Sequence, residues 1–227
     1  MKTNRRAGFT LIELLVVIAI IATIAAFAVP ALTSAMTRGQ MTGTLNNMHQ
    51  LHLAAQQMAI DGDTNADGTL GWPGDITSPN AIASLSAYCD KLISNNYLQG
   101  ADVKKILSAP SVNCTFGGGT TAANGTYTAI SNLTNPALKV YLVKSSNPSN
   151  TIFAETANYT YNQALTSTGA PYGDKGFIVQ RKGGDAAMLR KAQATGSGTT
   201  FQSTVGRVPN DQDGTVGSEQ GAVLTSN

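Results

Sequence analysis

The sequence is poor in charge. Only 12% of its 227 residues are Asp, Glu, Lys or Arg, about half the share in an average globular protein. Three of the 15 basic side chains, Lys2, Arg5 and Arg6, precede Gly8, and the chain after Gly8 carries 12 basic against 13 acidic residues. Nucleic-acid binding normally needs a clustered basic surface, so a nucleic-acid ligand is not expected.

The motifs of common catalytic sites are also absent. The sequence has no G-x-S-x-G turn, and the glycine run at 117–119 is not followed by the Lys-Ser pair of a phosphate-binding loop. The only histidines, His49 and His52, are three residues apart, a spacing that can place two imidazoles on one helix face for a metal. No third ligand lies near them in sequence, so we expect an exposed helix surface and no enzyme activity.

Cysteine is scarce as well. Cys89 and Cys114 are 25 positions apart, without a C-x-x-C motif or a nearby histidine pair. This spacing supports neither a zinc site nor a thioredoxin-type redox motif. We predict a disulfide between them, because such bonds persist outside the cytoplasm; the alternative is two unrelated thiols.

A long apolar run follows the short basic start. The 21 residues from Phe9 to Val29 contain one charge, and a helix of that length spans the roughly 30 Å hydrocarbon layer of a bilayer. The basic residues before Gly8 are expected on the cytoplasmic side, which puts the chain after Pro30 outside the cytoplasm.

The single charge in this run is Glu13. A carboxylate in a membrane segment costs a few kcal/mol, and neither a cleaved secretory signal nor a plain signal anchor needs one. Both of these alternatives therefore explain the run less well than a segment in which Glu13 has a partner.

The residues from Arg6 to Ile21, RAGFTLIELLVVIAII, closely resemble the class III signal of type IV pilins and type II secretion pseudopilins. The resemblance implies that a prepilin peptidase cuts after Gly8 and methylates the new amino terminus at Phe9. It also implies that Glu13 pairs with the terminal amine of a neighbouring subunit, and that the long helix bends at Pro30.

The same resemblance implies a setting and partners. The chain would be a single-pass protein of the inner membrane with its head in the periplasm. An inner-membrane assembly platform would then build it, as a homo-oligomer, into a helical filament outside the cell or in the periplasm. The expected parts are a leader at 1–8, a transmembrane and assembly half-helix at 9–29, an amphipathic half-helix at 30–61 and a globular head at 62–227.

Apolar periodicity extends the first helix well beyond the membrane segment. Six apolar residues recur at steps of three or four and predict one buried face: Met41, Leu45, Met48, Leu51, Ala55 and Met58. We therefore predict one helix from Phe9 to about Ile60, bent where Pro30 removes a hydrogen bond.

The segment after this helix contains a candidate calcium loop. Asp63, Asn65 and Asp67 alternate before a glycine, as in the first half of a helix-following calcium loop, and Asp75 supplies a late carboxylate. Position twelve is Gly74 instead of glutamate, so any calcium site would be weak, and the alternative is a solvated turn. A second, poorer pattern is Asp211 to Gly214 with Glu219.

The remaining sequence predicts an α+β head. Helical spacing indicates a second helix over 81–100 and a short helical turn before Pro110. Three segments predict an antiparallel sheet: 139–144, 151–160 and 176–181. An irregular strand is expected at 126–130, and the Gly-, Ser- and Thr-rich tail from Ala192 is expected to be loop with a strand at 200–206.

These observations favour a structural subunit of a type II secretion pseudopilus or of a type IV pilus-like filament. The alternative is a minor pilin or membrane-tethered binding module at a filament tip, which would serve adhesion, substrate capture or DNA capture. No cofactor is required by either function, and calcium is the only candidate.

Overall fold

The computed structural model describes residues 9–76, 82–116, 130–210 and 217–226. The chain forms two compact units, one ending at Gly39 and the other beginning at Gln40. The helix α1, Leu11–Asn65, contributes to both. This confirms the predicted long helix, which ends five residues later than expected.

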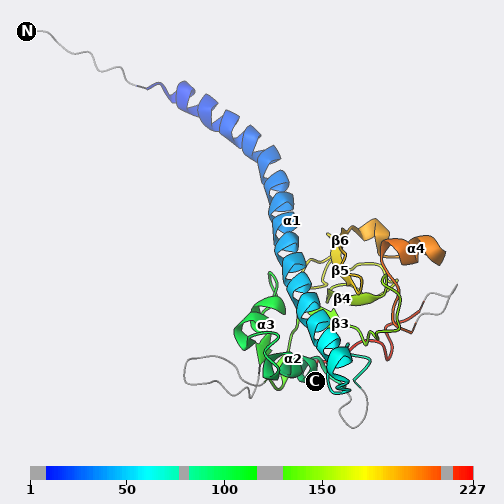
Figure 1. The fold of residues 1–227 in the computed structure, drawn as a ribbon. Coiled ribbons are helices and arrows are strands. Elements are labelled where there is room, and N and C mark those ends of the chain that lie inside the picture. Colours follow the sequence, from blue (N-terminus) through cyan, green and yellow to red (C-terminus); the bar gives the residue numbers. More distant parts are fainter. Residues whose placement is uncertain (1–8, 77–81, 117–129, 211–216, 227) are drawn as a thin grey trace, which may run out of the picture. The chain divides into compact units, whose positions relative to one another are not determined.

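The apolar face of α1 forms the centre of the second unit. Met48, Leu51, Ala55 and Met58 have no exposed surface, as the spacing of three and four predicts for one face of a helix. Figure 1 shows this part of α1, in cyan, with α2 and α3 on one side and the larger sheet on the other. The helices α2 and α3 span Leu85–Ser94 and Gly100–Ile106.

The larger sheet is antiparallel, with strand order β3-β4-β5-β6. Its strands are Leu138–Val140, Ile152–Thr156, Phe177–Arg181 and Ala186–Leu189. β4 and β5 are buried at every position, and both are inner strands that lie between β3 and β6. The three predicted strands are thus confirmed, and β6 is an addition.

A smaller sheet pairs β1, Thr115–Phe116, with β2, Leu133–Thr134. The predicted irregular strand at 126–130 lies outside the described residues, except for Ile130, which is buried. The α+β class with a long first helix, a head of short helices and a small antiparallel sheet is confirmed.

The predicted strand at 200–206 is wrong. This segment is the helix α4, Gly198–Thr204, which follows the 3-10 helix η1, Lys191–Gln193. Phe201 and Val205 are one helical turn apart and both buried, and this spacing of four residues outweighs the β-propensity of the threonines. The side chains of Ser203 and Thr204 also donate hydrogen bonds back to the Thr200 carbonyl.

Candidate functional site

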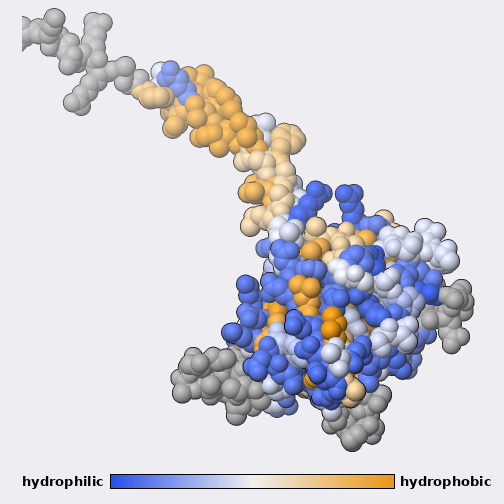
Figure 2. Space-filling model, viewed as in Figure 1, coloured by the Kyte–Doolittle hydropathy of each residue, from blue (hydrophilic) through white to orange (hydrophobic). Residues whose placement is uncertain are grey.

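The described part of the first unit, residues 9–39, is an exposed apolar helix. Among the described residues, α1 is the one helix long and apolar enough to cross a membrane, judged by length and composition alone. The continuous apolar surface is visible as orange in Figure 2. Its large side chains are about half exposed or more: Leu11, Ile12, Leu14, Leu15, Val16, Val17, Ile18, Ile20, Ile21, Ile24, Phe27, Val29, Leu32 and Met36.

An apolar surface of this extent does not persist in water, because soluble proteins rarely expose contiguous apolar patches larger than a few hundred Å². The helix therefore needs lipid or other protein around it. Phe9 stands at its start with 87% of its surface exposed, and Gly8 lies outside the described residues.

Glu13 has an intramolecular partner at the helix start. Its Oε2 accepts hydrogen bonds from the Thr10 backbone nitrogen at 2.8 Å and from Thr10 Oγ1 at 2.7 Å. The Glu13 nitrogen donates to Thr10 Oγ1 at 3.3 Å. This reciprocal arrangement is a capping box, which satisfies two free N–H groups at a helix start.

The role of Thr10 was missed by the sequence analysis. The signal was available, since Thr10-Leu11-Ile12-Glu13 fits the T-x-x-E pattern of a capping box before an apolar run. In the single chain Glu13 is thus held by its own Thr10, beside the residue that would become the new amino terminus.

Pro30 lies inside α1 without ending it. Proline has no N–H and removes one helical hydrogen bond. The Pro30 carbonyl accepts side-chain hydrogen bonds from Thr33 Oγ1 at 2.9 Å and Ser34 Oγ at 3.0 Å, an interaction that often accompanies bent helices.

Of the candidate calcium residues, Asp63, Asp67 and Asp75 line one open hollow beside the end of α1. Asp63 and Asn65 are in the last turn of α1 instead of a loop. Asp67 accepts the Thr69 backbone N–H at 2.9 Å, and Asp75 accepts the Ser145 backbone N–H at 2.7 Å.

The Asp67 contact is local to its turn, whereas the Asp75 contact joins segments that are 70 residues apart in sequence. In the part of the chain that the structure describes, no three His, Cys, Asp or Glu side chains come together to hold a metal. Of the second pattern, 211–214 lies outside the described residues and Glu219 forms an ion pair with Lys139. Calcium binding stays a prediction from the sequence alone.

The two histidines differ from the expected exposed pair. His49 is exposed but His52 is buried at 1%, where Nε2 lies 2.8 Å from the Lys182 carbonyl oxygen. The expectation for His52 is wrong, because position 52 follows the buried Leu51 and turns toward Trp72 and Phe153.

Cys89 and Cys114 are both buried free thiols. They lie close enough for the ionisation of Cys114 to act on the pKa of Cys89, which burial raises first and Cys114 raises further. The disulfide between Cys89 and Cys114 stays a prediction.

Comparison with known proteins found one matching family model and several similar fimbrial proteins. The prokaryotic N-terminal methylation motif matches residues 3–29. The type IV major fimbrial protein FimA of Dichelobacter nodosus is 35% identical over 77 residues, which is 34% of this chain and 47% of the relative. The fimbrial protein EcpC of Eikenella corrodens is 34% identical over 103 residues, which is 45% of this chain and 60% of the relative.

The chain therefore spans about half the length of the curated relatives it matches. No solved structure matches it significantly. A methylation motif on an exposed apolar helix, an α+β head and similarity to fimbrial proteins together support a type IV pilin-family protein.

Proposed function

We propose that the protein is a structural filament subunit, cut after Gly8 by a prepilin peptidase, methylated at Phe9 and polymerised through its first helix. The observation that carries the proposal is the apolar surface of residues 9–39, whose start holds the carboxylate of Glu13. Bilayer lipid would cover this surface before assembly, and the helices of other subunits would cover it afterwards.

In this proposal the unassembled subunit is anchored in the inner membrane with its head in the periplasm. An inner-membrane assembly platform then incorporates the subunit into the filament. The matched relatives are fimbrial proteins, and the N-terminal signal is one that type IV pilins and type II secretion pseudopilins have in common, so the proposed filament is a pilus or a pseudopilus. A major subunit dominates preparations of sheared filaments, whereas a tip protein with binding activity is a trace component, so abundance separates these two functions.

Glu13 is the residue on which assembly depends. A lone carboxylate in lipid is costly, and the positively charged Phe9 amine of a neighbouring subunit would supply a stronger partner than Thr10. Exchange of the Thr10 contact for the Phe9 amine would set the axial offset between adjacent helices.

The test is the yield of sheared filaments from Glu13→Leu and Glu13→Asp strains, measured beside the amount of processed subunit in the membrane fraction. We expect Glu13→Leu to be inserted and cleaved but not to form filaments, and Glu13→Asp to give an intermediate yield. Filaments at the parent level from Glu13→Leu would overturn the proposed role of this charge.

Thr10→Val tests the capping box, with Thr23→Val as its matched control. Thr23 is an exposed threonine of the same apolar segment that donates only to the Ala19 carbonyl, at 2.8 Å. Thr10→Val leaves Glu13 without a partner in lipid before assembly, so we expect less inserted subunit and a lower filament yield, whereas Thr23→Val should leave both unchanged.

A further inference from the structure

The last described segment, residues 217–226, lies along the outer edge of the larger sheet. β3 is an outer strand, and the segment pairs with its open side. The Leu142 nitrogen donates to the Ala222 carbonyl at 2.7 Å, and the Leu224 nitrogen donates to the Val140 carbonyl at 2.9 Å. We call residues 217–226 the strap.

The strap connects the sheet to the start of α2. The Leu85 nitrogen donates to the Thr225 carbonyl at 2.7 Å, and Thr225 Oγ1 donates to the Ala83 carbonyl at 3.0 Å. Ala222 and Leu224 are buried. Because an unpaired outer strand is a template for pairing with other chains, the strap covers a surface that would otherwise be open.

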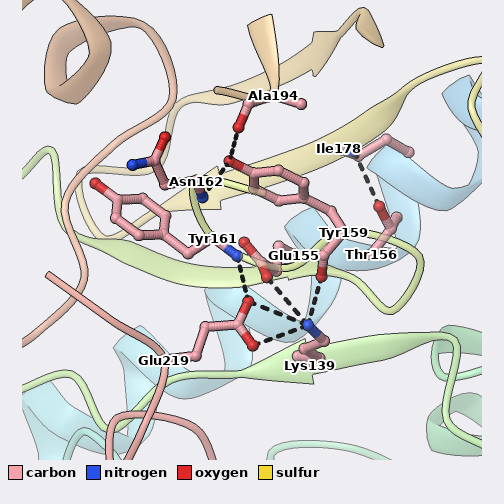
Figure 3. Close-up of polar contacts among 9 residues, drawn as sticks. All are labelled: Lys139, Glu155, Thr156, Tyr159, Tyr161, Asn162, Ile178, Ala194 and Glu219. Atoms are coloured by element: carbon pink, nitrogen blue, oxygen red, sulfur yellow. Dashed lines mark hydrogen bonds and ion pairs between the residues drawn. The ribbon is translucent and has the colours of Figure 1, made fainter. Parts of the chain in front are cut away.

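An ionic cluster fixes the beginning of the strap (Figure 3). Lys139 Nζ lies 3.0 Å from Glu219 Oε2 of the strap and 3.6 Å from Glu155 Oε1 of β4, and it donates to the Tyr159 carbonyl. Glu219 Oε1 also accepts the Tyr161 backbone N–H at 2.5 Å. Lys139 and Glu155 face each other directly across β3 and β4.

Glu155 is the unusual member of this cluster. It is fully buried, and neither carboxyl oxygen has a hydrogen bond. Burial raises the pKa of Glu155 well above its ordinary value; Lys139 opposes this effect and Glu219 adds to it. The raised pKa favours the protonated form of Glu155 while the head is closed.

The described groups that face Glu155 contain one positive charge for two carboxyl groups. β3 and the residue after it contribute Lys139 and Tyr141, the strap contributes Glu219, and the turn after β4 contributes Tyr159. The partner of Glu155 on β5 is Val179, which has no charge. With Glu155 protonated, Lys139 and Glu219 neutralise each other; with Glu155 ionised, the cluster has an excess negative charge in a buried place.

We propose that the strap is a proton-controlled clasp: while Glu155 carries a proton, Lys139 holds Glu219 and the strap stays on β3, and loss of that proton releases the strap from the sheet edge. Release uncovers the Val140 carbonyl and the Leu142 N–H group, which are the pairing groups of the outer strand.

On loss of the proton the strap moves and β4 stays in place, because Glu219 and Glu155 are held differently. Glu155 is in an inner strand that is buried at every position and paired on both sides. Glu219 has 19% of its side chain exposed and lies where the strap begins. Ionised Glu155 repels Glu219 and competes for Lys139, so Glu219 moves into solvent.

Hydrogen exchange of the full chain in detergent micelles, followed from pH 5 to pH 9, tests this. In the parent, exchange of the Leu142 and Leu224 amides reports the equilibrium constant between the closed and the open strap, here called the opening constant. This constant should rise by up to about tenfold per pH unit above the ordinary carboxyl pKa. Glu155→Gln resembles the protonated acid and has no proton to lose, so its opening constant should stay constant. Comparing the two proteins at each pH removes the intrinsic pH dependence of exchange.

Two further variants separate the clasp from a general loss of stability. Glu219→Gln removes the strap's charge and should loosen the strap at every pH. Asp174→Asn breaks an exposed ion pair with Lys191, whose atoms are 2.8 Å apart, and should leave the strap unchanged.

Two results would overturn the proposal. The first is a ratio of parent to Glu155→Gln opening that does not change with pH. The second is an equal loss of protection at β4–β5 amides such as that of Gln180, since this would show unfolding of the whole sheet. If Glu155→Gln does not fold, the parent's pH series alone decides, by comparing the strap amides with those of β4 and β5.

Discussion

His52 shows what one buried titratable residue contributes to the head. Its ring packs against Trp72 at 5.6 Å and Phe153 at 5.5 Å, measured between ring centroids. Nε2 is hydrogen-bonded to the Lys182 carbonyl, while Nδ1 is buried without a partner. Burial lowers the pKa of His52 and is the largest effect. The hydrogen bond to the Lys182 carbonyl opposes it, His49 lowers the pKa further, and Asp185 has a smaller raising effect.

This lowered pKa predicts an acid sensitivity. The unfolded chain binds the proton more tightly than the folded chain, so the stabilisation from neutral His52 is complete above the ordinary pKa of 6.5 and is lost as pH falls through the lowered pKa. Each unit of lowering corresponds to about 1.4 kcal/mol. His52→Gln keeps a donor for the Lys182 carbonyl and cannot be protonated.

The measurement is thermal melting of the parent and His52→Gln between pH 8 and pH 5. We expect the parent to lose more stability toward acid than His52→Gln. His49→Gln is the control, because His49 is on the same helix but exposed, and it should keep most of the parent's acid loss. Parallel melting curves for the parent and His52→Gln would contradict the assignment.

The two cysteines make a second residue-scale prediction. Burial raises the pKa of Cys114 to about 11, and Cys89 is also fully buried, so neither thiol reacts readily once the chain is folded, and the predicted bond would form during folding. We expect peptide mapping of protein exported by its own host, without reductant, to recover the linked pair. The bond would close a ring of roughly 25 residues and add about 3 kcal/mol in the chain-entropy model. Two alkylated thiols after unfolding would exclude it.

At the scale of elements, two glycines of α1 differ in their surroundings. A Cβ at Gly62 would lie 2.4 Å from the Leu70 carbonyl oxygen and 2.8 Å from the Leu70 carbonyl carbon. Gly62 therefore lets the chain fold back closely against the end of α1. At Gly43 a Cβ would meet nothing within 4 Å.

Replacing each by alanine should have opposite effects. Gly62→Ala forces backbone apart and should cost about 1–3 kcal/mol, whereas Gly43→Ala should stabilise the helix by up to about 1 kcal/mol through helix propensity. Thermal melting of both variants checks this. A similar change in melting temperature for the two would show that the contact with Leu70 does not restrict position 62.

The elements differ in how far the sequence predicts them. α1 and β5 were predicted nearly to their ends, because their apolar pattern is long or strongly β-branched. The prediction of a strand at 200–206 was wrong because the burial of two apolar residues, Phe201 and Val205, determines the secondary structure of this segment. The other residues of the segment are mostly small or polar. Local composition carries little information there, and tertiary packing determines the helix.

The parts of the candidate site also differ in this respect. Glu13 and Phe9 stand out in the sequence, and Thr10 could have been found from the T-x-x-E pattern. The cluster of Lys139, Glu155 and Glu219 could not, because Glu219 is 80 residues from Lys139 and reaches it only through pairing of the strap with β3. Sequence spacing does not report such long-range pairing.

At the scale of the whole molecule, the chain has two surfaces of opposite character. Residues 9–39 expose a continuous apolar helix, while the unit from Gln40 encloses one apolar core beneath a mostly polar surface (Figure 2). The first unit requires a nonaqueous environment and the second does not. In the proposed function, lipid surrounds the apolar helix in a first stage, and the helices of other copies of the chain surround it in a second stage.

In the proposed function, the change between these stages begins with cleavage after Gly8, and the last prediction concerns that step. Cleavage after Gly8 would remove Lys2, Arg5 and Arg6 and leave 12 basic against 13 acidic residues. The charged anchor on the cytoplasmic side would disappear and a new amine at Phe9 would appear next to Glu13. Both effects favour movement of the helix out of the membrane into a filament.

Intact-mass analysis of protein purified from its native host checks this. We expect a chain that begins at Phe9 and carries one added methyl group. An ordinary signal peptidase would instead leave a start near Ala26, and a plain anchor would leave the chain uncut; either mass would contradict processing by a prepilin peptidase. Gly8→Val is the matched variant: its chain should accumulate uncut in the membrane, because the bulkier residue occupies the cleavage position. Without the free Phe9 amine, this variant should form no filaments even though Glu13 is intact.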